Sequence, residues 1–220
     1  MKLASVRPQT VEIEPGTVMN FWDPNEAATK KGKNKPALVL LHGFATDGIL
    51  TWQFQVPFLT RKYAVYVPDF LFFGVSFTDR AERSPEFQAE CLVKGLMKLG
   101  VERCIVVGFS YGGMVGFKMA ELWPQLVESM VVSCSVLALT QSISRDGLER
   151  IGFSSWSDCR LPNSVKGEND KIFNTEIAHN LKEQLGDKAM LRLIDKAGHT
   201  SFNWSDPAST TGASRKFLPL

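Results

Sequence analysis

Ser110 has the surroundings expected of a nucleophilic serine. It lies in Gly108-Phe109-Ser110-Tyr111-Gly112-Gly113, after the apolar run Ile105–Val107 and before an apolar stretch from Met114 to Trp123. This pattern predicts a strand, a sharp turn and a helix, because larger residues at the flanking glycines would collide with strand or helix. The turn would direct the serine hydroxyl towards a helix N-terminus, where backbone N–H groups can stabilise an anion. The alternative is a glycine-rich turn that carries a solvent-exposed serine.

A nucleophilic serine needs a base, and the base needs an acid that orients it. His199 follows the predicted last strand, Met190–Ile194, in the loop Asp195-Lys196-Ala197-Gly198-His199. Ligands bind at the carboxyl ends of strands in open α/β sheets, so His199 is the expected base. Asp170 is the expected acid, because it precedes His199 with one helix and one strand between them.

The other histidines and two other acids are weaker candidates. His179 falls within a predicted amphipathic helix, where a structural role is expected. His42 directly follows a predicted strand and precedes glycine, which suits backbone packing and an oxyanion loop better than a catalytic base. Asp146 and Asp158 do not follow an apolar strand, so neither is favoured as the acid.

The elements expected around these residues alternate between strand and helix. Buried strands are predicted over Ala37–Leu41, Tyr63–Val67, Cys104–Val107 and Met130–Val136, and a hairpin over Thr10–Glu14 and Thr17–Trp22 with Pro15-Gly16 at its turn. Helices are predicted over Thr51–Leu59, from Ser84-Pro85 to Gly100, and from Thr175 to Gly186. Such alternation predicts an α/β fold with a mostly parallel sheet and helices on both faces.

The composition narrows the classes of function. The chain has 220 residues, 44% of them hydrophobic, which suits a single domain with one substantial core. The net charge is +2, and the only basic cluster is the loop Lys30–Lys35, so no nucleic-acid partner is expected. The histidines and cysteines lack metal-ligand spacing, so neither a metal nor an organic cofactor is expected.

The cysteines and the apolar runs indicate which cellular compartment to expect for the protein. The four cysteines show no C-x-x-C spacing, and we interpret them as buried free thiols in a reducing, cytoplasmic compartment. The start of the chain has no apolar segment of the kind found in signal peptides. No apolar run reaches the roughly 18 residues that a transmembrane helix needs.

The chain resembles the α/β-hydrolase fold family in three fragments, which are LLHGF, GFSYGG and GEND with AGH. More narrowly, these fragments resemble the plant lipase- or esterase-like members, which carry a helical cap. PDFLFFGVSF also resembles the loop after the fourth strand in that group. The resemblance covers Val11–Asp158 almost continuously and then Gly167–His199. It implies an α/β-hydrolase fold, with Ser110 as nucleophile, His199 as general base and Asp170 as the acid that orients the base.

The same resemblance implies the oxyanion hole and the substrate. It places the oxyanion donors at the backbone N–H groups of Phe44 and Tyr111. Serine at the turn disfavours the dehalogenase and epoxide-hydrolase branches, which carry aspartate there, and favours a small-molecule carboxylic ester. The residues expected to line the substrate pocket are Phe44, Phe70, Leu71, Phe72 and Phe73, with Phe153 and Trp156 from the lid region. So many aromatic side chains favour an apolar acyl group, although many of them are expected to belong to the core.

Two features depart from the family pattern. Arg160–Asp170 contains no apolar run of strand length, whereas family members carry a strand and a helical cap before the acid. Only Ser142–Trp156 remains as a possible lid helix, so a truncated cap is expected over residues 135–166, inside a single α/β-hydrolase domain over residues 1–199. Residues 200–220 are rich in Ser, Thr, Pro and Gly and predict an irregular tail.

These departures leave three alternatives to an active esterase. A parallel sheet without its strand before the acid would place Asp170 less accurately, so the chain could be a shortened variant with an impaired triad. It could also be a non-catalytic protein that binds a small ligand on the same fold, or a folding-defective or regulatory fragment without its own chemistry. The sequence leaves open which of these applies, which ester is cleaved and how many copies assemble.

Overall fold

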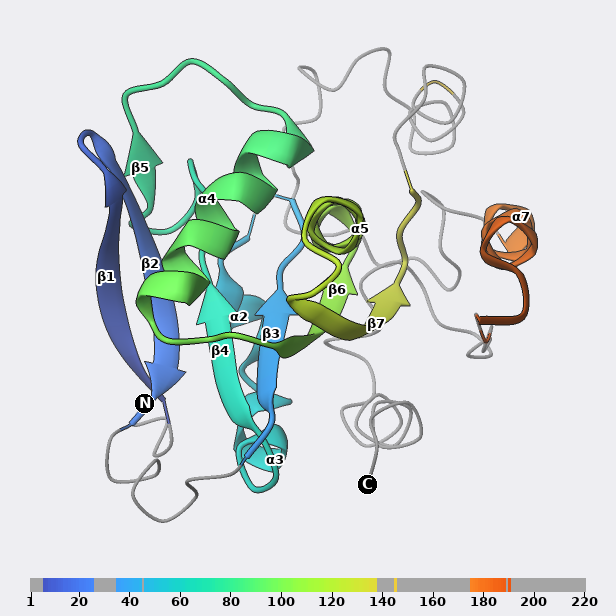
Figure 1. Ribbon diagram of the computed structural model, residues 1–220, viewed down its shortest axis with the longest axis horizontal. Coiled ribbons are helices and arrows are strands. Elements are labelled where there is room, and N and C mark those ends of the chain that lie inside the picture. Colours follow the sequence, from blue (N-terminus) through green and yellow to red (C-terminus); the bar gives the residue numbers. More distant parts are fainter. Residues whose placement is uncertain are drawn as a thin grey trace.

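The computed structural model describes residues 6–25, 35–44, 46–137, 145, 175–188 and 190. In these residues a seven-stranded sheet has the strand order β1-β2-β4-β3-β6-β7, with β5 beside β2 (Figure 1). The strands are β1 (Val6–Glu14), β2 (Thr17–Pro24), β3 (Ala37–Leu41), β4 (Ala64–Pro68), β5 (Phe77–Thr78), β6 (Cys104–Phe109) and β7 (Val127–Ser133). Strands β4, β3, β6 and β7 run parallel, and β2 is antiparallel to β1, β4 and β5. The predicted mostly parallel sheet is therefore confirmed.

Helices cover both faces of the sheet, as predicted. The helices are α2 (Gly48–Trp52), α3 (Val56–Leu59), α4 (Pro85–Lys98), α5 (Tyr111–Leu122) and α7 (Thr175–Leu185), the last followed by a 3-10 turn over Gly186–Lys188. Successive strand residues point to opposite faces. Val39 and Leu41 accordingly join the buried cluster under α4 and α5, whereas Leu38 and Leu40 join the cluster under α2 and α3.

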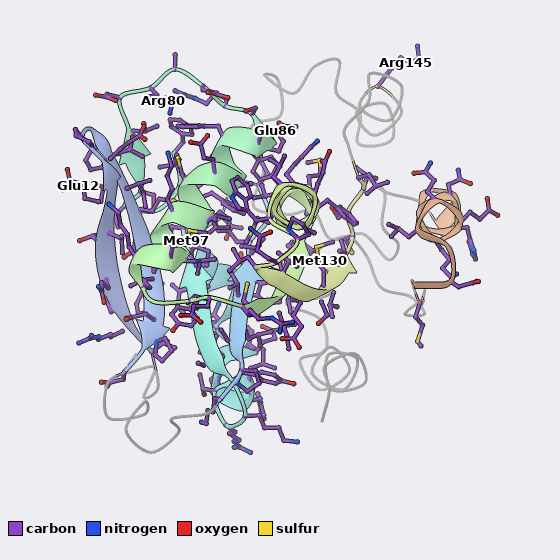
Figure 2. All side chains as sticks on the ribbon, in the orientation of Figure 1. Glu12, Arg80, Glu86, Met97, Met130 and Arg145 are labelled. Atoms are coloured by element: carbon purple, nitrogen blue, oxygen red, sulfur yellow. The ribbon has the colours of Figure 1, made fainter. Side chains whose placement is uncertain are left out.

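The helix α4 has the ends that its sequence predicts. The Ser84 side chain caps it by accepting a 3.2 Å hydrogen bond from the amide of Phe87, and Pro85 occupies its first turn. Gly100, with a φ of 77°, follows its last residues in a left-handed conformation that glycine adopts readily. Glu86 lies at the N-terminal end of α4 beside α5 (Figure 2) and forms a 3.1 Å ion pair with Lys118.

One predicted helix is wrong as a single element. Thr51–Leu59 is instead divided between α2 and α3, with Gln53–Gln55 between them. Pro57 lies in the first turn of α3, where its missing N–H does no harm, but it could not donate within a helix that ran on from α2. The sequence contained this breaker, and its effect is to end α2 early.

The predicted strand at Met130–Val136 is displaced by three residues. The observed strand β7 runs from Val127 to Ser133, and its first half contains the polar residues Glu128 and Ser129. Of the described strands only β6 pairs with β7, so part of β7 stays exposed and tolerates polar side chains. The predicted strand Met190–Ile194 lies outside the described residues except for Met190. No described helix is both long enough and apolar enough to cross a membrane.

Candidate active site

Ser110 occupies the junction between β6 and α5 with a strained backbone. Its φ of 51° and ψ of −119° lie outside the regions that residues other than glycine favour. The Ser110 amide donates a 2.9 Å hydrogen bond to the carbonyl oxygen of Ser133, and the Ser110 carbonyl accepts one of 2.9 Å from Gly113. These bonds hold Ser110 at the apex of the predicted turn. Strain of this kind occurs mostly at functional sites.

The glycines around Ser110 permit a close approach that larger residues would prevent. A Cβ atom at Gly108 would lie 2.7 Å from the Cα of Gly113. A Cβ atom at Gly112 would lie 2.5 Å from the carbonyl oxygen of Leu41 at the end of β3. The predicted collision at both positions is confirmed, and the start of α5 therefore packs directly on the end of β3.

The loop after β3 borders this turn. A Cβ atom at Gly43 would lie 3.4 Å from the Cβ of Ser110 and 3.0 Å from the ring of Phe109. In the described residues, neither the Phe44 nor the Tyr111 amide donates a hydrogen bond to the rest of the protein. Tyr111 is the first residue of α5, where amides lack a partner within the helix. The amides of Phe44 and Tyr111 therefore have no acceptor among the described residues, and both residues adjoin the segments that meet at Ser110.

His42 has the backbone role that the sequence predicts. It is fully buried, its Nδ1 lies 2.7 Å from the carbonyl oxygen of Gly43, and its Nε2 accepts a 2.9 Å hydrogen bond from the amide of Phe70. Desolvation by burial lowers the pKa of His42 to about 4. The ring is therefore neutral at ordinary pH with the proton on Nδ1, and both nitrogens are engaged by the backbone.

Five aromatic rings form a closed circle of contacts beside Ser110. The centroid distances are 4.5 Å for His42–Phe70, 5.6 Å for Phe70–Tyr111, 6.2 Å for Tyr111–Phe44, 5.5 Å for Phe44–Phe73 and 5.4 Å for Phe73–His42. Four of these contacts are edge-to-face, a favourable geometry for aromatic pairs. We call this set the aromatic circle. It joins the loop after β3, the loop after β4 and the start of α5.

Of the predicted pocket residues, Phe44 and Phe73 belong to the aromatic circle. Phe70 also belongs to it, but Phe70 and Leu71 are fully buried in the core, so neither lines an open pocket in the described residues. Phe72 has a different described neighbour. The guanidinium carbon of Arg83 lies 3.4 Å from the centroid of the Phe72 ring. Phe72 has a positive φ of 74°, and its side chain is partly exposed. Asp170, His199, Phe153 and Trp156 lie outside the described residues.

Sequence reasoning missed two polar side chains that hold the loop after β4. The buried carboxylate of Asp69 accepts 2.8 Å hydrogen bonds from the Gly48 amide and from the side-chain amide of Asn20, and its desolvation raises the pKa of Asp69. The buried Gln88 accepts a 3.0 Å hydrogen bond from the Leu71 amide and donates one of 3.1 Å to the Leu71 carbonyl. The sequence signal that could have found them is a polar residue among apolar ones. Asp69 directly follows a buried strand, and Gln88 lies on the apolar face of α4.

The described residues contain no cluster of three or more histidine, cysteine, aspartate or glutamate side chains that could hold a metal ion. Of the cysteines, Cys91 and Cys104 are buried free thiols, and burial raises the pKa of each, to about 11 and about 12 respectively. Cys134 is also a free thiol but is only partly buried, so the prediction of buried thiols is confirmed for Cys91 and Cys104, and Cys159 lies outside the described residues.

Comparison with characterised proteins identifies relatives over part of the chain. Human epoxide hydrolase 4 is 28% identical over 110 residues, which is 48% of this chain and 29% of the human protein. Pyrrolizixenacetamide deacetylase of Xenorhabdus hominickii is 29% identical over 123 residues, 56% of this chain and 44% of the deacetylase. The chain thus spans less than half the length of these curated relatives.

Solved structures share the fold more widely. The crystal structure of a bacterial membrane phospholipase A superposes with a TM-score of 0.76 at 19% identity, covering 98% of this chain and 86% of the phospholipase. An identity this low supports the fold alone. Residues 36–154, more than half of the chain, match the sequence profile described as alpha/beta hydrolase fold. The strand–turn–helix at Ser110 and the mostly parallel sheet agree with that match, and the chain belongs to the α/β-hydrolase fold family.

Proposed function

We propose that this chain is a serine hydrolase that cleaves carboxylic esters with an apolar acyl group. The observation that carries the proposal is the backbone of Ser110, which is held with a positive φ between β6 and the N-terminus of α5. A residue other than glycine adopts this backbone conformation at a cost in free energy. At a turn from strand to helix, the conformation exposes the side chain at the edge of the sheet. His199 is the proposed general base, and Asp170 is the proposed acid that orients it.

The reaction would run in two stages. In the first, the Ser110 Oγ attacks the ester carbonyl while His199 takes the hydroxyl proton, and the tetrahedral intermediate then releases the alcohol, which receives that proton. In the second, His199 removes a proton from water, the resulting hydroxide attacks the acyl-serine, and the carboxylic acid leaves as Ser110 recovers its proton. Asp170 stays ionised and holds the imidazole in the tautomer that accepts the proton.

The two unused amides support an oxyanion hole. Each stage places a negative charge on the former carbonyl oxygen, and preorganised N–H donors stabilise that charge. The Tyr111 amide directly follows Ser110, the Phe44 amide follows Gly43, which adjoins Ser110, and neither amide donates elsewhere in the described hydrogen-bond pattern. The N-terminus of α5 adds a partial positive charge at the same place. Losing one such donor typically lowers kcat by about 100- to 1,000-fold.

The likeness to relatives favours acyl transfer over epoxide opening. The deacetylase relative carries a name that denotes removal of an acyl group. Epoxide hydrolase 4 is also similar, but aspartate is the nucleophile of the epoxide-hydrolase branch, whereas this chain has serine at the turn. The exposed ring of Phe44 and the adjoining ring of Phe73 offer apolar contacts beside Ser110. These features together favour an apolar acyl group.

We further propose that residues 1–199 form one hydrolase domain, with a residual cap over residues 135–166 and an irregular tail over residues 200–220. A cytoplasmic location fits the free thiols of Cys91 and Cys104, since a reducing compartment keeps such thiols unpaired. The substrate would be a small-molecule ester, without a metal or an organic cofactor.

Hydrolysis of nitrophenyl esters tests the proposal. Wild type should cleave acetyl, butyryl and octanoyl esters, with kcat/KM rising with acyl length, and Ser110→Ala should abolish turnover. Ser133→Ala is the matched control, because it removes the hydroxyl of a neighbouring serine but keeps the backbone carbonyl that bonds the Ser110 amide. Tight binding of an ester without turnover would favour the non-catalytic alternative. A folded wild type that neither binds nor cleaves esters would favour the impaired variant.

A further inference from the structure

The Phe44 amide needs accurate placement if it is to stabilise an oxyanion. Catalytic donors work well when held within about 0.5 Å of the productive position. Yet the Phe44 side chain is 69% exposed, so general burial contributes little to holding it. Its described ring contacts are those with Phe73, at 5.5 Å, and with Tyr111, at 6.2 Å. The position of the Phe44 ring therefore depends on how firmly the rings of Phe73 and Tyr111 are held.

Phe73 is carried by a tightly bonded turn. Its amide donates a 3.1 Å hydrogen bond to the Phe70 carbonyl, and its own carbonyl accepts one of 3.1 Å from the Ser76 amide. The Ser76 hydroxyl donates a 2.8 Å hydrogen bond to the Asp69 carbonyl and accepts one of 2.9 Å from the Asn20 amide of β2. The turn is thus bonded within itself and to the sheet.

The same turn is bonded to two further elements. The Gln88 side chain of α4 forms hydrogen bonds with both the amide and the carbonyl of Leu71. The Asp69 carboxylate accepts a hydrogen bond from the Gly48 amide at the start of α2. His42 accepts the Phe70 amide, so the loop that carries Phe44 is tied to the turn on its buried side. On the exposed side of the aromatic circle, the contact between the loop and the turn is the edge-to-face pair of Phe73 and Phe44.

We infer that Phe73 is a positioning residue for the Phe44 amide: its ring, carried by the bonded turn over residues 69–76, sets the place of Phe44 beside Ser110. This inference rests on the proposed function for its catalytic consequence. It gives Phe73 a role beyond lining the pocket. A pocket wall affects substrates according to the acyl group that touches it, whereas a positioning residue affects every acyl group alike.

The test compares Phe73→Leu with Phe73→Tyr, which keeps the aromatic ring. Phe77→Leu is the matched control, because Phe77 follows the same turn with its side chain 55% exposed and is not part of the aromatic circle. We expect Phe73→Leu to lower kcat about tenfold for acetyl, butyryl and octanoyl esters alike with little change in KM, a fraction of the loss from removing an oxyanion donor. Phe77→Leu should retain the wild-type kcat, and Phe73→Tyr should recover most of the kcat that Phe73→Leu loses.

A second readout does not depend on turnover. The ¹⁵N order parameter of the Phe44 amide should fall in Phe73→Leu from a rigid value of about 0.85 towards about 0.6, and stay high in the other two variants. An unchanged order parameter in Phe73→Leu would overturn the inference, as would a loss confined to KM that grows with acyl length. A wild type without esterase activity would contradict the proposed function instead, and the order parameter alone would then decide the inference.

Discussion

The amide of Ser110 donates a 2.9 Å hydrogen bond to the carbonyl oxygen of Ser133 and so ties the apex of the turn after β6 to the end of β7. The pairing of β6 with β7 runs up to Phe109 and Ser133, so this bond continues the ladder for one more residue. Ser110 therefore leaves the strand conformation while its amide still bonds as a strand residue would. The neighbouring strand thereby helps to stabilise a backbone conformation that is unfavourable on its own.

The close contact between α5 and β3 predicts a difference between two glycines of the same helix. Gly112→Ala should destabilise the protein by about 1–3 kcal/mol or more, because the new Cβ would lie 2.5 Å from the backbone oxygen of Leu41. Gly116→Ala is the control, since the nearest neighbour of its new Cβ would be the end of the flexible Met130 side chain, at 3.0 Å. Urea unfolding measures both changes in free energy. Equal effects of the two substitutions would contradict the close approach at Gly112.

The buried imidazole of His42 predicts a dependence of stability on pH. The pKa of His42 falls from 6.5 in the unfolded state to about 4 in the folded state. Between these pH values the unfolded state therefore binds a proton that the folded state does not bind. Stability should therefore decrease as the pH falls from 6.5 towards 4, by about 3 kcal/mol in total, and this contribution should become constant below pH 4.

The histidine contribution is measured by comparing variants over that pH range. His42→Gln should be less stable than wild type above pH 6.5, and the difference between the two should shrink towards pH 4. The exposed His179 of α7 provides the control for replacing a histidine by glutamine, and His179→Gln should change the stability by less than about 0.5 kcal/mol. A constant difference between wild type and His42→Gln over the range would show that His42 titrates normally when folded.

Gln88 predicts a cost in stability when its amide is removed. Gln88→Leu would leave the amide and the carbonyl of Leu71 without partners in a buried setting, at a cost of about 1–3 kcal/mol for each group. Gln53→Leu is the control, because the Gln53 amide donates to the Leu50 carbonyl at the surface and should be worth less than about 0.5 kcal/mol. Chemical denaturation distinguishes the two, and a loss of similar size in both would contradict the proposed hold on Leu71.

Local signals in the sequence were enough to predict most of the described fold. The buried strands β3, β4 and β6 are continuous apolar runs, and Ser84 with Gly100 marks the two ends of α4. These features depend on residues that are near one another in the sequence. The glycine spacing around Ser110 likewise predicts the turn, because the collisions it avoids occur within one strand–turn–helix unit.

The remaining features depend on contacts between distant residues. The position of β7 follows from its pairing with β6, which no local pattern in Val127–Ser133 specifies. No sequence pattern around Asp69 predicts its hydrogen bond with the amide of Gly48, which lies 21 residues earlier. The aromatic circle joins three separate loops, so its residues could be recognised as candidates from the sequence but their mutual contacts could not.

The central claim is that Ser110 is an activated nucleophile, and reaction with a fluorophosphonate probe followed by peptide mass spectrometry tests it most directly. The probe phosphonylates an activated serine whatever the natural ester is. We expect one adduct, on the peptide that contains Ser110, in wild type and Ser133→Ala, and no adduct in Ser110→Ala or His199→Ala. A wild type that unfolds cooperatively yet carries no adduct, or an adduct that persists in Ser110→Ala, would contradict the account.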